Sequence, residues 1–260
     1  AAISRHLDEV KLPFMVDFCY LDQGVRINGT WYPIVKMQWI EGLNLNQFVE
    51  QALDQPAMLD QLLGLWIKLA GRLRGAGIAH ADLQHGNVLL VQLTGSDRLG
   101  LRLIDYDGMY VPALADQRSG EVGHPAFQHP QRLREGTYSV EVDRFSHLAI
   151  CTALRCLRIG GRPLWKRFNN GENLLFVERD FAAPGESELF RELWKLPHPD
   201  AHSLIGRLAL AAQGRLEETP WIEDVAAPGA PRPLSLEEQR AAQRLLDRTA
   251  VARPSGASPL

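Results

Sequence analysis

Three polar residues, Asp82, Asn87 and Asp105, are of types and at spacings that suit the transfer of a phosphoryl group. Asp82 and Asn87 lie in a polar run, residues 80–87, and Asp105 follows the apolar end of another segment. Phosphoryl transfer needs a carboxylate that orients the attacking hydroxyl and accepts its proton, and it needs hard oxygen ligands for Mg²⁺. One carboxylate and one amide oxygen can suffice, because Mg²⁺ keeps several of its waters.

The segments around these residues are predicted to bring them together. Residues 88–92 and 99–105 flank the turn sequence 94–97, which predicts a β-hairpin. The base of that hairpin joins the polar loop to the end of the second strand, so the three polar residues should surround one small volume. Alone, the loop could be only a polar turn before a strand. The position of Asp105 at the matching strand end favours a functional site.

The rest of the chain is predicted to form an α+β domain that is mainly helical in its later part. Residues 1–12 are expected to be the end of a helix that Pro13 stops. The further expectations are strands at 14–21 and 30–40 with turns at 22–24 and 28–29, a helix at 44–54 capped by Asn44, a helix from Pro56 to about 75, irregular chain at 106–140, a buried helix at 142–157 and short helices over 160–222.

The C-terminal part is expected to be a linker followed by one more helix. Residues 226–234 are rich in Pro, Ala and Gly, which is typical of a linker. Ser235 and Glu238 form a capping-box sequence that predicts a helix start. The tail from Arg253 is expected to be disordered.

Composition excludes several classes of protein. The chain has 260 residues, 45% of them hydrophobic and 23% charged, which is ordinary for a globular protein. A net charge of -3, without a basic stripe, gives no reason to expect nucleic acid as a partner. No apolar run is long enough to span a bilayer, so no membrane association is expected. The 3 cysteines are sparse and favour a reducing, cytoplasmic location. The first residues start in mid-pattern, which suggests a fragment or a processed chain.

The two polar segments resemble motifs of the protein-kinase superfamily. His80, Asp82 and Asn87 match the catalytic loop H-R-D-x-x-x-x-N, with Ala81 in place of its arginine. Residues 105–107, Asp-Tyr-Asp, are similar to D-F-G. The resemblance implies that Asp82 is the catalytic base, that Asn87 and Asp105 are Mg²⁺ ligands, and that His80 is structural.

Flanking segments resemble the same superfamily in the same order, over about residues 5–160. Residues 36–42 look like the hinge that binds adenine. Residues 123–131 resemble the end of an activation segment, with Gln131 in place of the usual Glu. Asp143 resembles the aspartate that braces the catalytic loop. The resemblance implies an ATP-binding edge at Met37, Gln38, Trp39 and Ile40, where Met37 takes the gatekeeper place and Trp39 and Ile40 offer backbone groups.

The sequence also departs from the kinase pattern. The Gly-rich loop and the phosphate-binding lysine would lie before residue 1, so the isolated chain is expected to be a poor catalyst. Gln84 stands where protein kinases commonly have Lys, and Ala81 removes the arginine that senses a phosphorylated activation loop. The loop is also similar to the H-G-D loops of aminoglycoside kinases, which leaves the acceptor class open.

The expected protein is therefore a bacterial-type, protein-kinase-like phosphotransferase with a truncated N-lobe. Residues 1–40 would be the end of the N-lobe and the start of the hinge, 41–222 the C-lobe, and 223–260 the linker, last helix and tail. The expected reaction is Mg²⁺-assisted transfer of the ATP γ-phosphoryl to a hydroxyl of a protein Ser or Thr. The alternatives are a pseudokinase that binds a nucleotide or a partner, and a small-molecule kinase of the aminoglycoside type.

Overall fold

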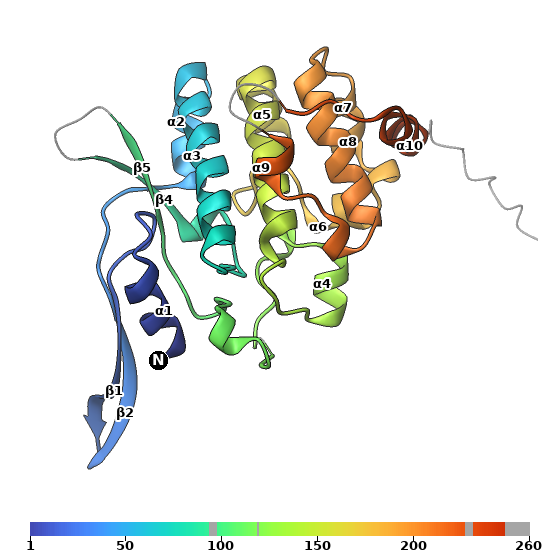
Figure 1. The fold of residues 1–260 in the computed structure, drawn as a ribbon. Helices are drawn as coiled ribbons and strands as arrows, with labels where there is room; N and C mark the ends of the chain where they lie inside the picture. The colour runs from blue at the N-terminus through green and yellow to red at the C-terminus, as the bar shows by residue number, and fades with distance from the viewer. Residues whose placement is uncertain (94–97, 119, 227–230, 248–260) are drawn as a thin grey trace, which may run out of the picture.

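The computed structural model describes residues 1–93, 98–118, 120–226 and 231–247. It is an α+β structure, in which two small antiparallel sheets lie to one side of a larger group of helices (Figure 1). The predicted turn at 94–97, the tail from Arg253 and residues 227–230 of the predicted linker lie outside the described residues.

An N-terminal helix and a two-stranded ribbon come first. The helix is α1 (Ala2–Val10), and the ribbon pairs β1 (Phe18–Ile27) with β2 (Thr30–Met37). The turn predicted at residues 28–29 is confirmed. Asn28 and Gly29 have φ angles of 48° and 86°, the positive values that tight hairpin turns require.

The turn predicted at residues 22–24 is wrong, because β1 runs through it as strand. Between the paired positions on either side, residues 22–24 of β1 face only Pro33 of β2. Proline has no N–H for the ladder, and strands accommodate it at bulges. The polar residues that suggested a turn therefore form a bulge. The ribbon also excludes residues 14–17 and 38–40, which were predicted to be strand.

The second sheet has the order β3–β4–β5. Its strands are β3 (Leu43–Asn44), β4 (Val88–Gln92) and β5 (Leu99–Leu103). The predicted hairpin is confirmed as the β4–β5 pair, with Val88 opposite Leu103, although β5 ends two residues early. The loop before β4 and the loop after β5 consequently leave the sheet at the same end.

Helices form the rest of the fold. α2 (Leu45–Ala52) begins at the predicted cap, where Asn44 and Gln47 exchange side-chain and backbone hydrogen bonds. α5 (Asp143–Phe168) is longer than predicted, and Gly161 bends it with a φ of 54°. The remaining helices are α3 (Pro56–Gly75), α4 (Pro130–Glu135), α6 (Glu178–Ala182), α7 (Glu188–Trp194), α8 (Pro199–Gln213), α9 (Ile222–Val225) and α10 (Leu236–Leu246). α4 lies within residues 106–140, which were predicted to be irregular throughout.

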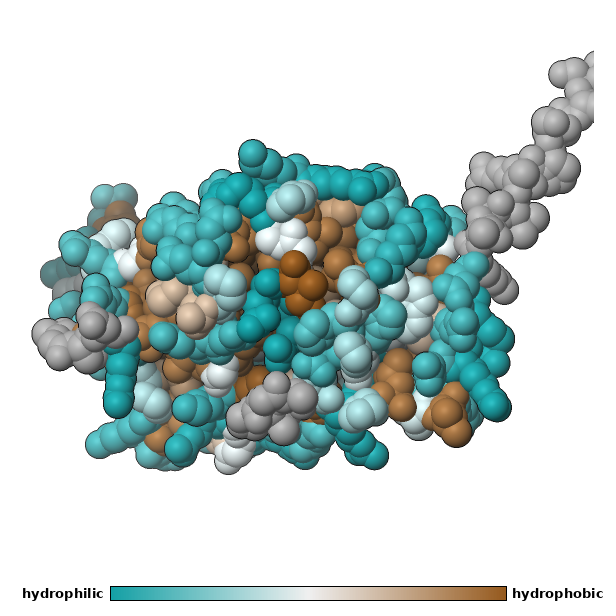
Figure 2. All heavy atoms as spheres, turned by 90° about the horizontal axis from the view of Figure 1, so that it is seen from above, coloured by the Kyte–Doolittle hydropathy of each residue, from teal (hydrophilic) through white to brown (hydrophobic). Residues whose placement is uncertain are grey.

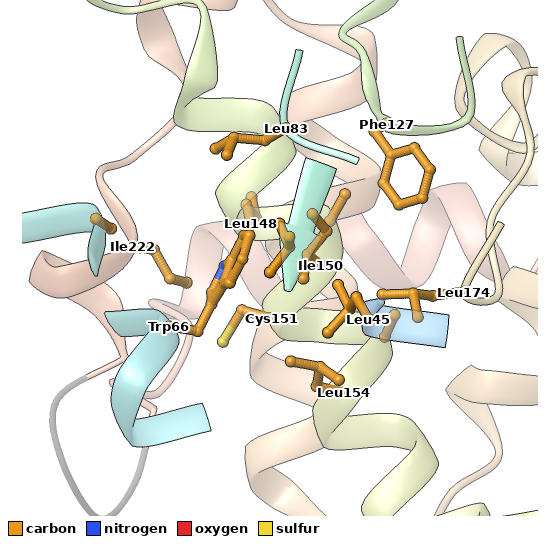
Figure 3. Close-up of a cluster of buried hydrophobic side chains, with 14 of the residues drawn as sticks. Leu45, Trp66, Leu83, Phe127, Leu148, Ile150, Cys151, Leu154, Leu174 and Ile222 are labelled. Carbon is orange, nitrogen blue, oxygen red and sulfur yellow. The ribbon is translucent and has the colours of Figure 1, made fainter. Parts of the chain in front are cut away.

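The main core lies between α3 and α5. Trp66 of α3 is fully buried, and its indole N–H donates to the carbonyl of His147 on α5 at 3.2 Å. In Figure 3 the Trp66 side chain lies beside Leu148 and Cys151 of α5. Full burial of one large apolar side chain stabilises a fold by roughly 1.5–3 kcal/mol. This core fixes the start of α5, which supports the candidate site.

The surface differs between the helices and the ribbon. On the face shown in Figure 2, polar side chains are interspersed with apolar ones. The ribbon, in contrast, exposes large apolar side chains, among them Ile27, Trp31, Tyr32 and Val35. None of the helices in the described ranges has both the length and the apolarity that crossing a membrane requires.

Candidate functional site

The loop between α3 and β4 carries the first group of candidate residues. After α3 ends, the N–H of Ile78 donates to the carbonyl of Leu73, and Ala79 exchanges two backbone hydrogen bonds with Tyr110. These bonds fasten the loop to the segment that follows β5. His80, the next residue, is fully buried. Its ring nitrogen Nε2 contacts the carbonyl of Ile104 at 2.9 Å. His80 therefore joins the two loops.

Asp143 braces this loop from the start of α5. Its two carboxylate oxygens accept the backbone N–H groups of His80 and Ala81, at 2.5 and 2.9 Å. This is the contact expected for Asp143. Burial raises the pKa of Asp143, while the neighbouring His80 ring, the positive charge of Arg132 and the two N–H donors oppose that rise. Ala81 has a φ of 69°, a strained angle for a residue with a side chain, and the paired N–H groups help to hold it.

Asp82 and Asn87 are in direct contact. The side-chain amide of Asn87 donates to Oδ2 and to the carbonyl of Asp82, both at 3.0 Å. Gln84 donates to the same Oδ2 at 3.2 Å. Because the Asn87 N–H₂ group faces Asp82, its amide oxygen Oδ1 points elsewhere and keeps its capacity as a ligand. The short 3₁₀ turn at His85–Asn87 and the start of β4 set this geometry.

Asp105 lies beside this pair, at the end of the neighbouring strand. The N–H of Ile104 donates to the carbonyl of Asn87 at 3.1 Å, which joins the two segments just before Asp105. Asp105 has a φ of 65° and an exposed side chain. Its carboxylate has no hydrogen-bond or ion-pair partner within the described residues. The structure thus brings Asp82, Asn87 and Asp105 together at one end of the hairpin.

An aromatic column holds the Asp105 loop against the ribbon. Tyr106 is in edge contact with the ring of His80 on one side and that of Phe18 on the other, with centroids 6.1 and 5.5 Å apart. The Tyr106 hydroxyl accepts from the N–H of Val16 and donates to the carbonyl of Leu103. Burial raises the pKa of Tyr106 to about 12, so the hydroxyl stays protonated. The sequence did not reveal this link to β1.

Residues 123–127 cover Asp82 from the other side, and the sequence did not indicate this contact either. The N–H of His124 donates to Asp82 Oδ1 at 2.7 Å. The His124 imidazole is also in edge contact with His85, and its Nε2 lies 3.9 Å from the Glu172 carboxylate. The carboxylate of Asp82 therefore has donors from its own loop and from a distant segment. In the sequence, the repeated His-Pro pairs at residues 124–125 and 129–130 were the pattern that could have pointed to this contact.

The residues of the implied adenine edge, Met37–Ile40, lie at a different cavity from the three polar residues. Met37 and Gln38 line a cavity of about 880 Å³ between α1 and the ribbon, but none of the three polar residues lines it. The Gln38 N–H donates to the carbonyl of Asp17. Trp39 is 87% exposed and Ile40 is half-buried. Within the described ranges the backbone groups of Trp39 and Ile40 have no hydrogen-bond partner.

No protein-family model matches this chain, and no curated protein matches it. The assignment of a function consequently depends on the geometry of these residues.

Asn87 and Asp105 are the residues of this group that could supply oxygen ligands to a hard cation with retained waters. Among the described residues there is no group of three or more His, Cys, Asp or Glu that could hold a metal ion. Asp105 supplies a free carboxylate and Asn87 a free amide oxygen, and the two residues are joined through Ile104. Oxygen ligands of this kind, few in number, suit Mg²⁺ brought with phosphate oxygens better than a closed protein cage.

Proposed function

We propose that this protein is an ATP-dependent phosphotransferase that moves the γ-phosphoryl group to a hydroxyl acceptor. The observation that carries the proposal is the joining of Asp82, Asn87 and Asp105 at the end of the β4–β5 hairpin. The brace from Asp143 beneath the loop supports it, because a site for phosphoryl transfer works mainly by positioning. We further propose a protein-kinase-like fold for the whole protein.

In this proposal each residue has a separate part. Asp82 orients the acceptor hydroxyl and takes its proton, while the N–H groups of His124 and Asn87 hold its carboxylate in place. Asn87 and Asp105 hold Mg²⁺, which would neutralise charge on the phosphate oxygens. Met37–Ile40 provide the edge for adenine, where the free backbone groups of Trp39 and Ile40 are the donors and acceptors. A protein Ser or Thr is the acceptor that we propose first.

The test is phosphate transfer from labelled ATP by the protein as its full coding sequence specifies it, with generic protein acceptors and aminoglycosides in parallel. Asp82→Asn and Asp105→Ala should each reduce transfer at least about a hundredfold, by loss of the base and of the metal ligand. Asp107→Asn is the matched control, because Asp107 is an exposed carboxylate of the same loop with no assigned part. Transfer that survives either of the first two substitutions would refute the site.

A binding module is the second candidate, and the exposed apolar ribbon of β1 and β2 favours it. Large exposed apolar patches commonly mark interaction surfaces. The same experiment separates the two functions. A folded protein that transfers no phosphate to any acceptor, with or without Mg²⁺, would favour the binding module.

A further inference from the structure

Arg132 of α4 is a charged side chain in an unusual place. It is fully buried, and it has no carboxylate within 4.0 Å in the described part of the chain. Only one of its nitrogens is paired, because Nη1 donates to the Gln128 side chain while Nε and Nη2 have no partner. Burial of a charge without compensation costs several kcal/mol, so such a residue calls for an explanation.

Two carboxylates, those of Asp143 and Asp82, act on Arg132. Burial lowers the pKa of Arg132, and the negative charges of Asp143 and Asp82 oppose that effect. Gln128 extends the link toward Asp82. Its Nε2 and Asp82 Oδ1 lie 2.7 and 2.8 Å from the position that a side-chain carbon on Gly123 would occupy. Arg132 is therefore hydrogen-bonded to Gln128, and the Gln128 amide lies next to the loop beside Asp82, although its Nε2 has no hydrogen-bond partner in the described residues.

Residues 80–87 include neither Arg nor Lys to balance these carboxylates, and His80 and Arg132, in that order, are the charged groups that act on Asp143. Position 81 is alanine and position 84 is glutamine, although the resemblance would place arginine and lysine there. Neither Asp82 nor Asp143 makes an ion pair within the described residues. Arg132 is a buried arginine whose charge interacts with both Asp143 and Asp82.

We propose that Arg132 is a positioning residue, the buried counter-charge that holds Asp143 and, through Gln128, the loop carrying Asp82 in one arrangement. Its catalytic consequence rests on the function proposed above, but its structural consequence does not.

A double-mutant cycle tests the structural part by urea unfolding. Arg132→Met removes the charge at similar length, and Asp143→Asn removes its partner. Each single variant should raise the unfolding constant roughly a hundredfold, because it leaves a buried charge unpaired. The unfolding constant of the double variant should be at least roughly tenfold smaller than the product of the two single-variant effects predicts. Arg134→Met, an exposed arginine of the same helix, is the control and should change little.

Additive effects in the cycle would overturn the proposal. If Arg132→Met does not fold, the double variant decides: recovery of folding supports the counter-charge, and continued failure refutes it. Arg132→Lys keeps the charge and should restore most of the stability. The amide protons of His80 and Ala81 donate to Asp143, and their exchange with solvent can be followed by NMR. They should exchange faster in Arg132→Met than in the wild type. In Arg134→Met they should exchange at the wild-type rate.

An activity arm separates this inference from the proposed function. In an active protein, Arg132→Met should lower kcat at least tenfold with little change in KM for ATP, and Arg132→Lys should recover most of it. A wild-type protein that transfers no phosphate would refute the proposed function, while the cycle and the amide exchange would still decide the role of Arg132.

Discussion

At the scale of single residues, Gly123 shows how tightly the candidate site is enclosed. It has a φ of 77°, and an added side-chain carbon would lie 2.7 to 2.8 Å from Gln128 Nε2, Ala81 O and Asp82 Oδ1. Gly136 has a similar φ of 63° but nothing within 4 Å of that position. The two glycines therefore share the backbone requirement and differ only in crowding.

Gly123→Ala should consequently destabilise the protein more than Gly136→Ala. The backbone strain costs about 1–2 kcal/mol at either position. At Gly123 the crowding adds roughly 1–3 kcal/mol and pushes His124 away from Asp82. Urea unfolding of both variants measures the difference. Equal losses of stability in the two variants would show that Gly123 is not in close contact with Ala81 and Asp82.

Sequence patterns predict some residues of the site and miss others for a physical reason. Asp82, Asn87 and Asp105 stand at the ends of two strands of one hairpin, so local pairing is enough to bring them together. His124 and Gln128 approach Asp82 from a segment about forty residues away, which is held to α5 by the hydrogen bond from Ser146 to the carbonyl of Phe127. Such contacts leave no period or spacing in the sequence.

At the scale of elements, two short helical turns begin with the same device, a histidine before a proline. The Nδ1 atoms of His124 and His129 accept the backbone N–H groups of Ala126 and Gln131. Each cap needs an unprotonated Nδ1. His129 is buried, and its other ring nitrogen lies 2.9 Å from the carbonyl of Ala211, so it acts as the donor there.

The histidine cap at His129 predicts a loss of stability in mild acid. Burial lowers the pKa of His129 below its ordinary 6.5. The unfolded chain therefore binds a proton below pH 6.5 that the folded chain does not, and stability falls as pH falls through that value. The contribution of His129 between pH 7.5 and 5.5 is at most about 1.4 kcal/mol.

His129→Asn is the matched test, because asparagine caps a helix without titrating in this range. The variant should be less stable at pH 7.5, since it loses the contact with Ala211. Its further loss between pH 7.5 and 5.5 should be smaller than that of the wild type by up to the same amount. Urea unfolding at the two pH values measures this. An unchanged pH dependence would show that His129 is not held neutral by the fold.

The sequence predicted helices and strands correctly where residues within one turn determine them. It failed where a residue on a neighbouring strand determines the structure. The cap residue Asn44 and the capping-box sequence at Ser235 predicted the starts of α2 and α10, because the cap is satisfied within one turn. Residues 22–24 carried a turn signal of the same kind, but the cross-strand partner Pro33 converts it into a bulge. α4 has only six residues, and its two N-terminal signals, His129 and Pro130, are shared with ordinary loops.

At the scale of the whole molecule, the C-terminal helix α10 is packed onto α8 rather than free. Arg207 of α8 is buried and donates to the carbonyls of Arg232 and Pro233, at 2.5 and 2.8 Å, and to Ser203. Ala242 and Leu246 of α10 are buried as well. The segment that was expected to be a linker is therefore fastened by one arginine just before α10 begins.

Arg207→Met should release α10 without disturbing the candidate site. The change leaves two carbonyls without their charged donor, which should lower the free energy of unfolding by about 3 kcal/mol or open the helix locally. Hydrogen exchange of the α10 amides should become faster, while the amides of His80 and Ala81 keep the wild-type rate. Arg244→Met, an exposed arginine on α10 itself, is the control and should change neither. Unchanged protection of α10 would show that Ala242 and Leu246 suffice to hold it, and faster exchange at His80 would show that the C-terminal helix and the candidate site open as one unit.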